Sequence, residues 1–180
     1  ELSQNSLIEL CHDLAPLFTN NRSIETIKVE EQFEKVTNTY SQLNDRYQIL
    51  INGRIDRVDR IKNTELLGVV DYKSGKGDDF KYDKFFNGLN SQLPTYLSAL
   101  KKLNDQNLFG AMYLPLTLPI IRLKGALDLS KAATQTQNQL KYNGLFLEKQ
   151  VSQLGDFYKK SKAYHLTEEE LQILIDYNDF

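Results

Sequence analysis

The sequence predicts an α/β fold with a mixed central β-sheet flanked by helices, and three features of the 180-residue chain support this. Residues 47–61 alternate between apolar and polar, while residues 65–72 are more uniformly apolar, so the two stretches predict neighbouring strands of a hairpin. Residues 88–103 carry leucines at helical spacing, and residues 108–116 form another apolar run. A strand, a crossover helix and a second strand of this kind form a right-handed unit within one sheet.

The composition is typical of a globular protein, with 41% hydrophobic and 26% charged residues. No apolar run approaches the length of a membrane-spanning helix, so no membrane partner is expected. The net charge of −2 provides no basic excess, and any contact with DNA is expected to be local. The single cysteine, Cys11, excludes an internal disulfide and fits a cytoplasmic protein, in which it is expected to pack in the first helix. Because the chain lacks an initiator Met, residues 1–180 are expected to be one domain excised from a longer protein.

The first half of the chain is expected to contribute a helix and three strands. A helix over residues 6–18 is predicted by four leucines at helical spacing, Leu7, Leu10, Leu14 and Leu17. Ser6 and Glu9 can open it as a capping box. Residues 24–36 favour a strand, and the stretches 47–61 and 65–72 follow as the second and third strands. The apolar character of the third strand is typical of one covered on both faces.

The second half opens with a charged, glycine-containing stretch, residues 74–84, that predicts a loop. The helix over residues 88–103 tolerates Pro94 in its first turn. Its buried stripe is expected to comprise Leu89, Leu93, Tyr96, Leu97, Leu100 and Leu103. The polar residues 130–140 indicate a flexible connection. Thr167 and Glu170 form a capping box for a final helix.

Two carboxylates and one amine gather on the predicted hairpin. A turn at Asn63–Thr64 sets a register that places Asp56 directly opposite Asp71, with Cβ atoms about 4.5 to 5.5 Å apart. Two like charges at this distance are destabilising unless a cation lies between them. Lys73 is two residues beyond Asp71, so it shares the same face of the strand.

This residue set predicts metal-dependent phosphodiester hydrolysis. A divalent cation can position a water, neutralise charge on the phosphate and assist the departing oxygen. Mg²⁺ prefers hard oxygen ligands, so the predicted metal ligands are the carboxylates of Asp56 and Asp71 and the backbone carbonyl of Tyr72, with Mn²⁺ as the alternative ion. Zinc is disfavoured because the chain has no cluster of His and Cys. The Lys73 ammonium can orient the attacking water and meet the charge that develops on the phosphate.

Roles outside catalysis are open for several acidic and aromatic side chains. Asp56 and Asp71 can be exposed acids near a turn, although their placement inside apolar strands disfavours this. Tyr96 has the spacing of a core residue as well as that of a site residue. Asp59 is expected on the opposite strand face, as an ion-pair partner of a neighbouring arginine rather than a catalytic group. Glu30 is expected to be a surface glutamate.

Three segments resemble the RecB-type nuclease branch of the PD-(D/E)xK superfamily: GRIDRVD (53–59), VVDYKSGKG (69–77) and NGLNSQLPTY (87–96). Within that branch the similarity is greatest to the AddB/RexB family, subunits of bacterial ATP-dependent helicase-nucleases that process double-strand breaks. The resemblance implies a restriction-endonuclease-like core, with Asp56 and Asp71 as metal ligands and Lys73 as the catalytic lysine. Gln92 and Tyr96 match the Q-x-x-x-Y motif of the family and are implied to belong to the active site.

The resemblance also implies an activity and partners. These are Mg²⁺-dependent hydrolysis of unwound single-stranded DNA in repair and recombination, and a helicase-nuclease partner subunit of the AddA/RexA type. The sequence lacks the G-x-x-x-H motif of the family, so His12 and His165, the latter expected in a loop, are given no role. It also lacks the four cysteines of an iron–sulfur cluster, which is therefore not supported by this chain. Two alternatives stay open: a stand-alone single-strand exonuclease of phage or CRISPR-associated type, and an inactive DNA-binding or scaffold module.

Overall fold

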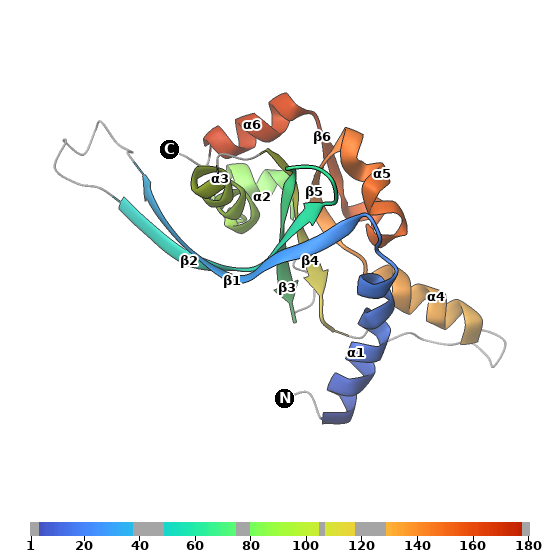
Figure 1. Ribbon diagram of the computed structural model, residues 1–180. Coiled ribbons are helices and arrows are strands. Elements are labelled where there is room, and N and C mark those ends of the chain that lie inside the picture. Colours follow the sequence, from blue (N-terminus) through green and yellow to red (C-terminus); the bar gives the residue numbers. More distant parts are fainter. Residues whose placement is uncertain (1–3, 38–48, 75–79, 105–106, 118–128, 178–180) are drawn as a thin grey trace.

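The computed structural model describes residues 4–37, 49–74, 80–104, 107–117 and 129–177. Its centre is a six-stranded sheet in which the spatial order of the strands follows the chain (Figure 1). The strands are β1 (Ile24–Thr37), β2 (Ile49–Ile61), β3 (Leu67–Lys73), β4 (Leu108–Pro115), β5 (Asn143–Leu147) and β6 (Tyr164–Leu166). The β3–β4 and β5–β6 pairs are parallel and the other three pairs are antiparallel. The predicted mixed sheet is therefore confirmed.

Helices cover both faces of the sheet (Figure 1). They are α1 (Gln4–Thr19), α2 (Tyr82–Phe86), α3 (Gln92–Asn104), α4 (Leu129–Gln139), α5 (Val151–Leu154) and α6 (Glu168–Tyr177). Side chains of α2, α3 and α6 pack on one face, and those of α1 and α5 pack on the other. Within the described ranges, no helix combines the length and the apolar character needed to cross a membrane.

Two hydrophobic cores hold these helices in place. On one face, Leu93, Leu97 and Leu100 of α3 are fully buried against the sheet. On the other face, Leu10 and Leu14 of α1 are buried in a second cluster. Burying one leucine side chain contributes about 1.5 to 3 kcal/mol. The three leucines therefore fix α3 firmly over the middle of the sheet.

The predicted hairpin register is confirmed. β2 pairs with β3 from Arg57↔Val70 to Arg60↔Leu67, as expected for a turn at Asn63–Thr64. The backbone ladder ends at the Arg57↔Val70 pair, one step before the two candidate carboxylates. Their mutual position must therefore be maintained by other contacts.

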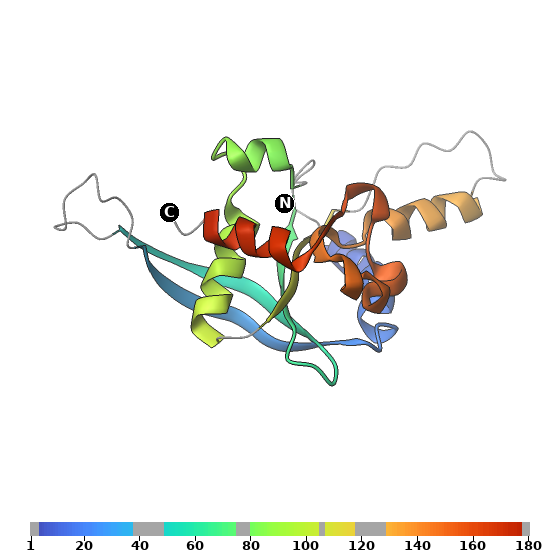
Figure 2. The ribbon, with the colours of Figure 1, turned by 90° about the horizontal axis from the view of Figure 1, so that it is seen from above.

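Strands β1 and β2 form a long antiparallel arm that continues beyond the other strands (Figures 1 and 2). Their pairing runs from Ile24↔Ile61 to Thr37↔Ile49. Residues 47 and 48 of the predicted second strand lie outside the described ranges.

Helix α3 begins four residues later than predicted, and the backbone of Gly88 explains why. Its φ of 72° lies in the left-handed region, and its N–H donates to the carbonyl of Phe85 at 2.8 Å, which closes the short helix α2. Leu89 falls before α3 and is 76% exposed, so its predicted place in the buried stripe is wrong. Helix α2 itself begins within the stretch predicted as a loop, residues 74–84, and ends two residues beyond it. Residues 75–79 of that stretch are outside the described ranges.

Several other predictions need correction. Residues 129–139 form helix α4 instead of a flexible connection, because their Lys, Ala and Gln residues are good helix formers even though no large apolar residue follows Leu129 in the helix. Strands β5 and β6 were not predicted, since runs of five and three residues are too short to show a period. Cys11 lies on α1 as expected, but it is exposed rather than packed. His165 lies in β6 and not in a loop.

Candidate active site

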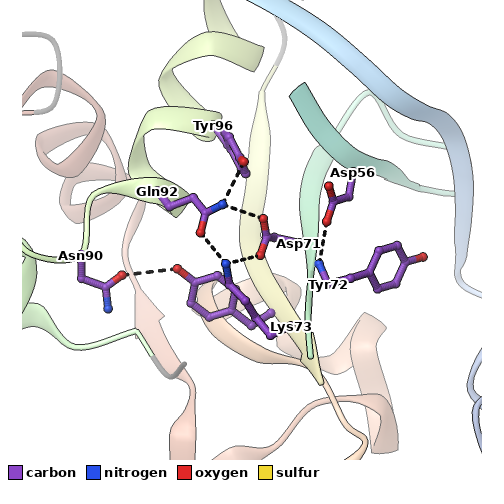
Figure 3. A network of polar contacts seen from close by, with 8 residues as sticks. Asp56, Asp71, Tyr72, Lys73, Asn90, Gln92 and Tyr96 are labelled. Carbon is purple, nitrogen blue, oxygen red and sulfur yellow. Dashed lines mark hydrogen bonds and ion pairs between the residues drawn. The ribbon is translucent and has the colours of Figure 1, made fainter. Parts of the chain in front are cut away.

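The candidate catalytic side chains lie where the β2–β3 ladder ends (Figure 3). Asp71 and Lys73 are two residues apart on β3, and both reach a side chain of α3. The Asp71 side chain is only 4% exposed, and that of Lys73 is 21% exposed. Because β3 lies between β2 and β4, these two charged groups are carried by a strand with neighbours on both sides.

Asp71, Lys73 and Gln92 form a closed triangle of polar contacts (Figure 3). The Lys73 ammonium lies 2.7 Å from Oδ2 of Asp71 and donates to Oε1 of Gln92 at 2.6 Å. Nε2 of Gln92 donates to Oδ1 of Asp71 at 2.8 Å. Each of the three side chains therefore restrains the other two.

Tyr96 combines a polar contact toward the candidate site with packing in the core. Its hydroxyl accepts a hydrogen bond from Nε2 of Gln92 at 2.9 Å. Its ring packs edge-on against Phe33, with centroids 5.8 Å apart. Burial raises the pKa of the Tyr96 hydroxyl, and the negative charges of Asp71 and Asp56 act in the same direction. The hydroxyl is therefore protonated at neutral pH.

Asp56 joins the site through the backbone of β3. The N–H of Tyr72 donates to Oδ2 of Asp56 at 2.9 Å. This contact continues the link between the two strands after the ladder has ended, and it brings the Asp56 carboxylate beside the end of β3 (Figure 3). The structure thus brings together all of the predicted site residues, Asp56, Asp71, Tyr72, Lys73, Gln92 and Tyr96.

The donor atoms at this point fit a hard divalent cation. Asp56 and Asp71 supply carboxylate oxygens from neighbouring strands. In an extended strand the N–H and C=O of one residue point to the same side, so the carbonyl of Tyr72 faces β2 together with its N–H. The carbonyl of Lys73 points the other way and accepts from the N–H of Leu116 at 2.7 Å. No group of three or more His, Cys, Asp or Glu side chains gathers within the described ranges, so a cation here would depend on two carboxylates, backbone and water, which suits Mg²⁺.

Tyr113, which lies beside Lys73, and its partner Asn90 were missed by the sequence analysis. Tyr113 on β4 turns its ring face to the ammonium, with Nζ 4.9 Å from the ring centroid. Its hydroxyl donates to Oδ1 of Asn90 at 3.3 Å. Tyr113 pairs with Asp71 in the parallel β3–β4 ladder. The sequence offered one signal for Tyr113, an aromatic residue in the middle of the next predicted strand. That signal points to the site only when the pairing of Tyr113 with Asp71 is known.

A second polar network lies on the opposite face of the same strands. Arg57 is 3% exposed, and its Nη2 lies 2.9 Å from Oδ2 of Asp59. The guanidinium also donates from Nη1 to the hydroxyl of Tyr72 at 2.9 Å and from Nη2 to the hydroxyl of Tyr142. Burial lowers the pKa of Arg57, but the charge of Asp59 and the two tyrosines outweigh it and raise the pKa above its usual range. The expected ion pair between Asp59 and a neighbouring arginine is confirmed.

Glu30 and the two histidines lie on other parts of the surface. Glu30 is on the β1–β2 arm, where its 57% exposed side chain pairs with Arg54 at 2.7 Å, as expected of a surface acid. His12 is exposed on α1, which packs on the face opposite the site. His165 is exposed on β6, and its ring contacts that of Tyr158 with centroids 5.8 Å apart.

Comparison with known proteins relates the chain to nucleases. Residues 7–172 match the family described as the PD-(D/E)XK nuclease superfamily. Over its whole length the chain is 43% identical to an ATP-dependent helicase/deoxyribonuclease subunit of Streptococcus pneumoniae strain Hungary19A-6, and equally to the "Exonuclease/helicase subunit RexB" of S. pneumoniae serotype 4. It is 34% identical over 179 residues, 98% of the chain, to an ATP-dependent helicase/deoxyribonuclease subunit of Streptococcus suis strain 05ZYH33. The chain spans 16% of the length of each of these relatives.

The family match includes β2, β3 and α3, the elements that bring the candidate site together. The mixed sheet with helices on both faces agrees with this family match. The chain belongs to the PD-(D/E)XK nuclease superfamily.

Proposed function

We propose that the chain is the nuclease domain of an AddB/RexB-type subunit and hydrolyses phosphodiester bonds of unwound single-stranded DNA with Mg²⁺. The observation that carries the proposal is the contact of the Lys73 ammonium with the buried Asp71 carboxylate, next to the carboxylate of Asp56. The names of the relatives, which include helicase, deoxyribonuclease and exonuclease, support it. In this proposal the protein acts in the cytoplasm, in double-strand break repair and recombination, beside a helicase-nuclease partner subunit of the AddA/RexA type.

Asp56, Asp71 and the carbonyl of Tyr72 would hold the metal ion, for which Mn²⁺ is the alternative. When bound, Mg²⁺ would stabilise negative charge on the phosphate and lower the pKa of a water. Lys73 acts from a fixed position, because Gln92 and Asp71 already orient its ammonium. A preorganised cation of this kind can meet the charge of the transition state without further rearrangement.

Gln92 and Tyr96 support this arrangement from α3. Gln92 contacts both the carboxylate of Asp71 and the ammonium of Lys73, so it sets their relative orientation. The Tyr96 hydroxyl accepts from Gln92 and, because its pKa is raised, keeps its own proton. That proton can be donated to a phosphate oxygen of the DNA.

The substitution Asp71→Ala tests the proposal. It removes one metal ligand, so Mg²⁺-dependent cleavage of single-stranded DNA should fall by about 10²-fold or more, as when one transition-state contact is lost. Circular dichroism and thermal unfolding should show that the variant remains folded. Asp83→Ala, which changes an exposed acid on α2, serves as the control and should cleave normally. Cleavage by Asp71→Ala at the level of the unchanged protein contradicts the proposed site.

A second candidate function is an inactive nuclease-fold module that binds DNA or acts as a scaffold. The small donor set favours it, because within the described ranges only two acidic side chains meet at the site and Lys73 already pairs with one of them. Calorimetry with Mg²⁺ and a degradation assay separate the two functions. Metal binding without cleavage supports the module, whereas cleavage without a partner subunit favours a stand-alone exonuclease.

A further inference from the structure

Tyr72 links β2 and β3 at the point where the candidate site lies and the backbone ladder has ended. The last ladder pair is Arg57↔Val70. Beyond it, the N–H of Tyr72 donates to Oδ2 of Asp56, and the hydroxyl of Tyr72 accepts from Nη1 of Arg57, each at 2.9 Å. The ring of Tyr72 points away from the other side chains of the site (Figure 3). Tyr72 therefore connects the two strands twice: its backbone N–H bonds to Asp56 at the candidate site, and its hydroxyl bonds to Arg57 on the reverse face of the sheet.

Arg57 provides a rigid anchor for this connection. Its guanidinium is buried, pairs with Asp59 at 2.9 Å and also donates to the hydroxyl of Tyr142. The planar guanidinium fixes the directions of its N–H groups relative to one another. The position of the Tyr72 hydroxyl is thereby defined relative to β2.

The end of β3 needs such a restraint. On its other side it is held by the parallel ladder with β4, which runs to Lys73↔Pro115. Tyr72 lies between Asp71 and Lys73, and side chains alternate along a strand. A rotation of the strand end that breaks the Tyr72 hydroxyl contact must therefore also turn Asp71 and Lys73 relative to Asp56.

We propose, on the basis of the proposed function, that the Tyr72 side chain is a positioning residue for the metal site. Its hydroxyl, bound by Arg57 on the reverse face of the sheet, sets the angle at which the two carboxylates meet. Residues that orient metal ligands in this way typically contribute about 10- to 100-fold to metal affinity.

A purely structural role would be to satisfy the buried guanidinium, and Tyr142 offers the matched comparison. Both tyrosines accept a hydrogen bond from Arg57, but only Tyr72 belongs to β3. Tyr72→Phe and Tyr142→Phe each remove one hydroxyl from the same arginine and keep the ring. Only Tyr72→Phe removes the link that the Tyr72 hydroxyl makes between β2 and β3.

Two readouts compare the variants: Mn²⁺ affinity by calorimetry, and hydrogen exchange of the Tyr72 amide by NMR in metal-free protein. Urea unfolding corrects both for any change in overall stability. Tyr72→Phe should weaken Mn²⁺ binding by about tenfold or more and accelerate exchange of the Tyr72 amide, which is bonded to Asp56. In Tyr142→Phe, Arg57 keeps its ion pair with Asp59 and its hydrogen bond to Tyr72, so both quantities should stay near their original values.

Equal shifts in the two variants, or no shift in either, overturn the positioning role. Arg57→Lys is an independent variant that keeps a cation beside Asp59 but lacks the guanidinium fork. It should reproduce the effects of Tyr72→Phe, and unchanged Mn²⁺ affinity in Arg57→Lys also contradicts the inference. Absence of Mn²⁺ binding in the unchanged protein counts against the proposed function, while the amide-exchange comparison still decides whether Tyr72 restrains the strand.

Discussion

At the scale of single residues, the candidate site depends on a neutral amide that holds a carboxylate and an ammonium together. Gln92 accepts from Lys73 through Oε1 and donates to Asp71 and Tyr96 through Nε2. A side-chain amide suits this position because it offers both an acceptor and donors without a charge. A carboxylate in its place would set another negative charge beside Asp71.

The substitution Gln92→Leu removes these three contacts while keeping a side chain of similar size. Asp71 and Lys73 each lose a partner, so the free energy of unfolding should fall by about 1 to 3 kcal/mol. The kcat for single-stranded DNA cleavage should fall more than KM changes, because orientation and not substrate binding is lost. Gln153→Leu, which changes an exposed glutamine on α5, is the control. An unchanged kcat in Gln92→Leu contradicts the orienting role.

The sequence predicted part of this site for physical reasons that differ from residue to residue. Asp56, Asp71 and Lys73 were expected to be neighbours because strand alternation and the turn at Asn63–Thr64 determine their relative positions locally. Tyr113 depends on β4 lying parallel to β3, which a single sequence does not reveal. Tyr142 is 85 residues from Arg57 in the chain, so their contact exists only in the folded protein.

At the scale of elements, local signals predicted the turn between β2 and β3 and the start of α6. They did not predict the starts of α1 and α3, because Ser6 of the expected capping box lies inside α1 and α3 begins four residues later than predicted. The capping box of α6 is present, since the N–H of Thr167 donates to Oε2 of Glu170 at 2.8 Å and the N–H of Glu170 donates to Oγ1 of Thr167 at 3.1 Å. The short strands β5 and β6 and the polar helix α4 have no comparable signal. Their structure comes from pairing with the sheet or from helix propensity, and neither produces a visible apolar period.

The substitution Thr167→Ala tests the contribution of this cap. Its loss leaves a backbone donor of the first turn without its partner, so the free energy of unfolding should fall by about 0.5 to 2 kcal/mol. Glu169→Ala, in the same turn but outside the capping box, should have a smaller effect. Urea unfolding of both variants provides the measurement, and equal stability of Thr167→Ala and the unchanged protein rules out a stabilising cap.

At the scale of the whole molecule, the two faces of one sheet carry different polar networks. The face under α3 and α6 presents Asp71 and Lys73 to Gln92, whereas the reverse face encloses Arg57 and Asp59. The mixed sheet that supports both was predictable, because a hairpin followed by a crossover helix requires antiparallel and parallel pairs. The contact between the two networks through Tyr72 was not predictable from the sequence, because it depends on where the β2–β3 ladder ends.

The cleavage rate of Lys73→Met, measured together with Mg²⁺ affinity, tests the central claim most directly. Methionine keeps an unbranched apolar stem but removes the ammonium. Both carboxylates remain and a competing cation is gone, so Mg²⁺ should still bind. The rate of single-stranded DNA cleavage should fall by about 10²- to 10³-fold. Lys84→Met, at an exposed position on α2, should cleave normally. If Lys73→Met binds Mg²⁺ and cleaves DNA at the original rate, Lys73 does not carry the chemistry and the proposed role of this site is contradicted.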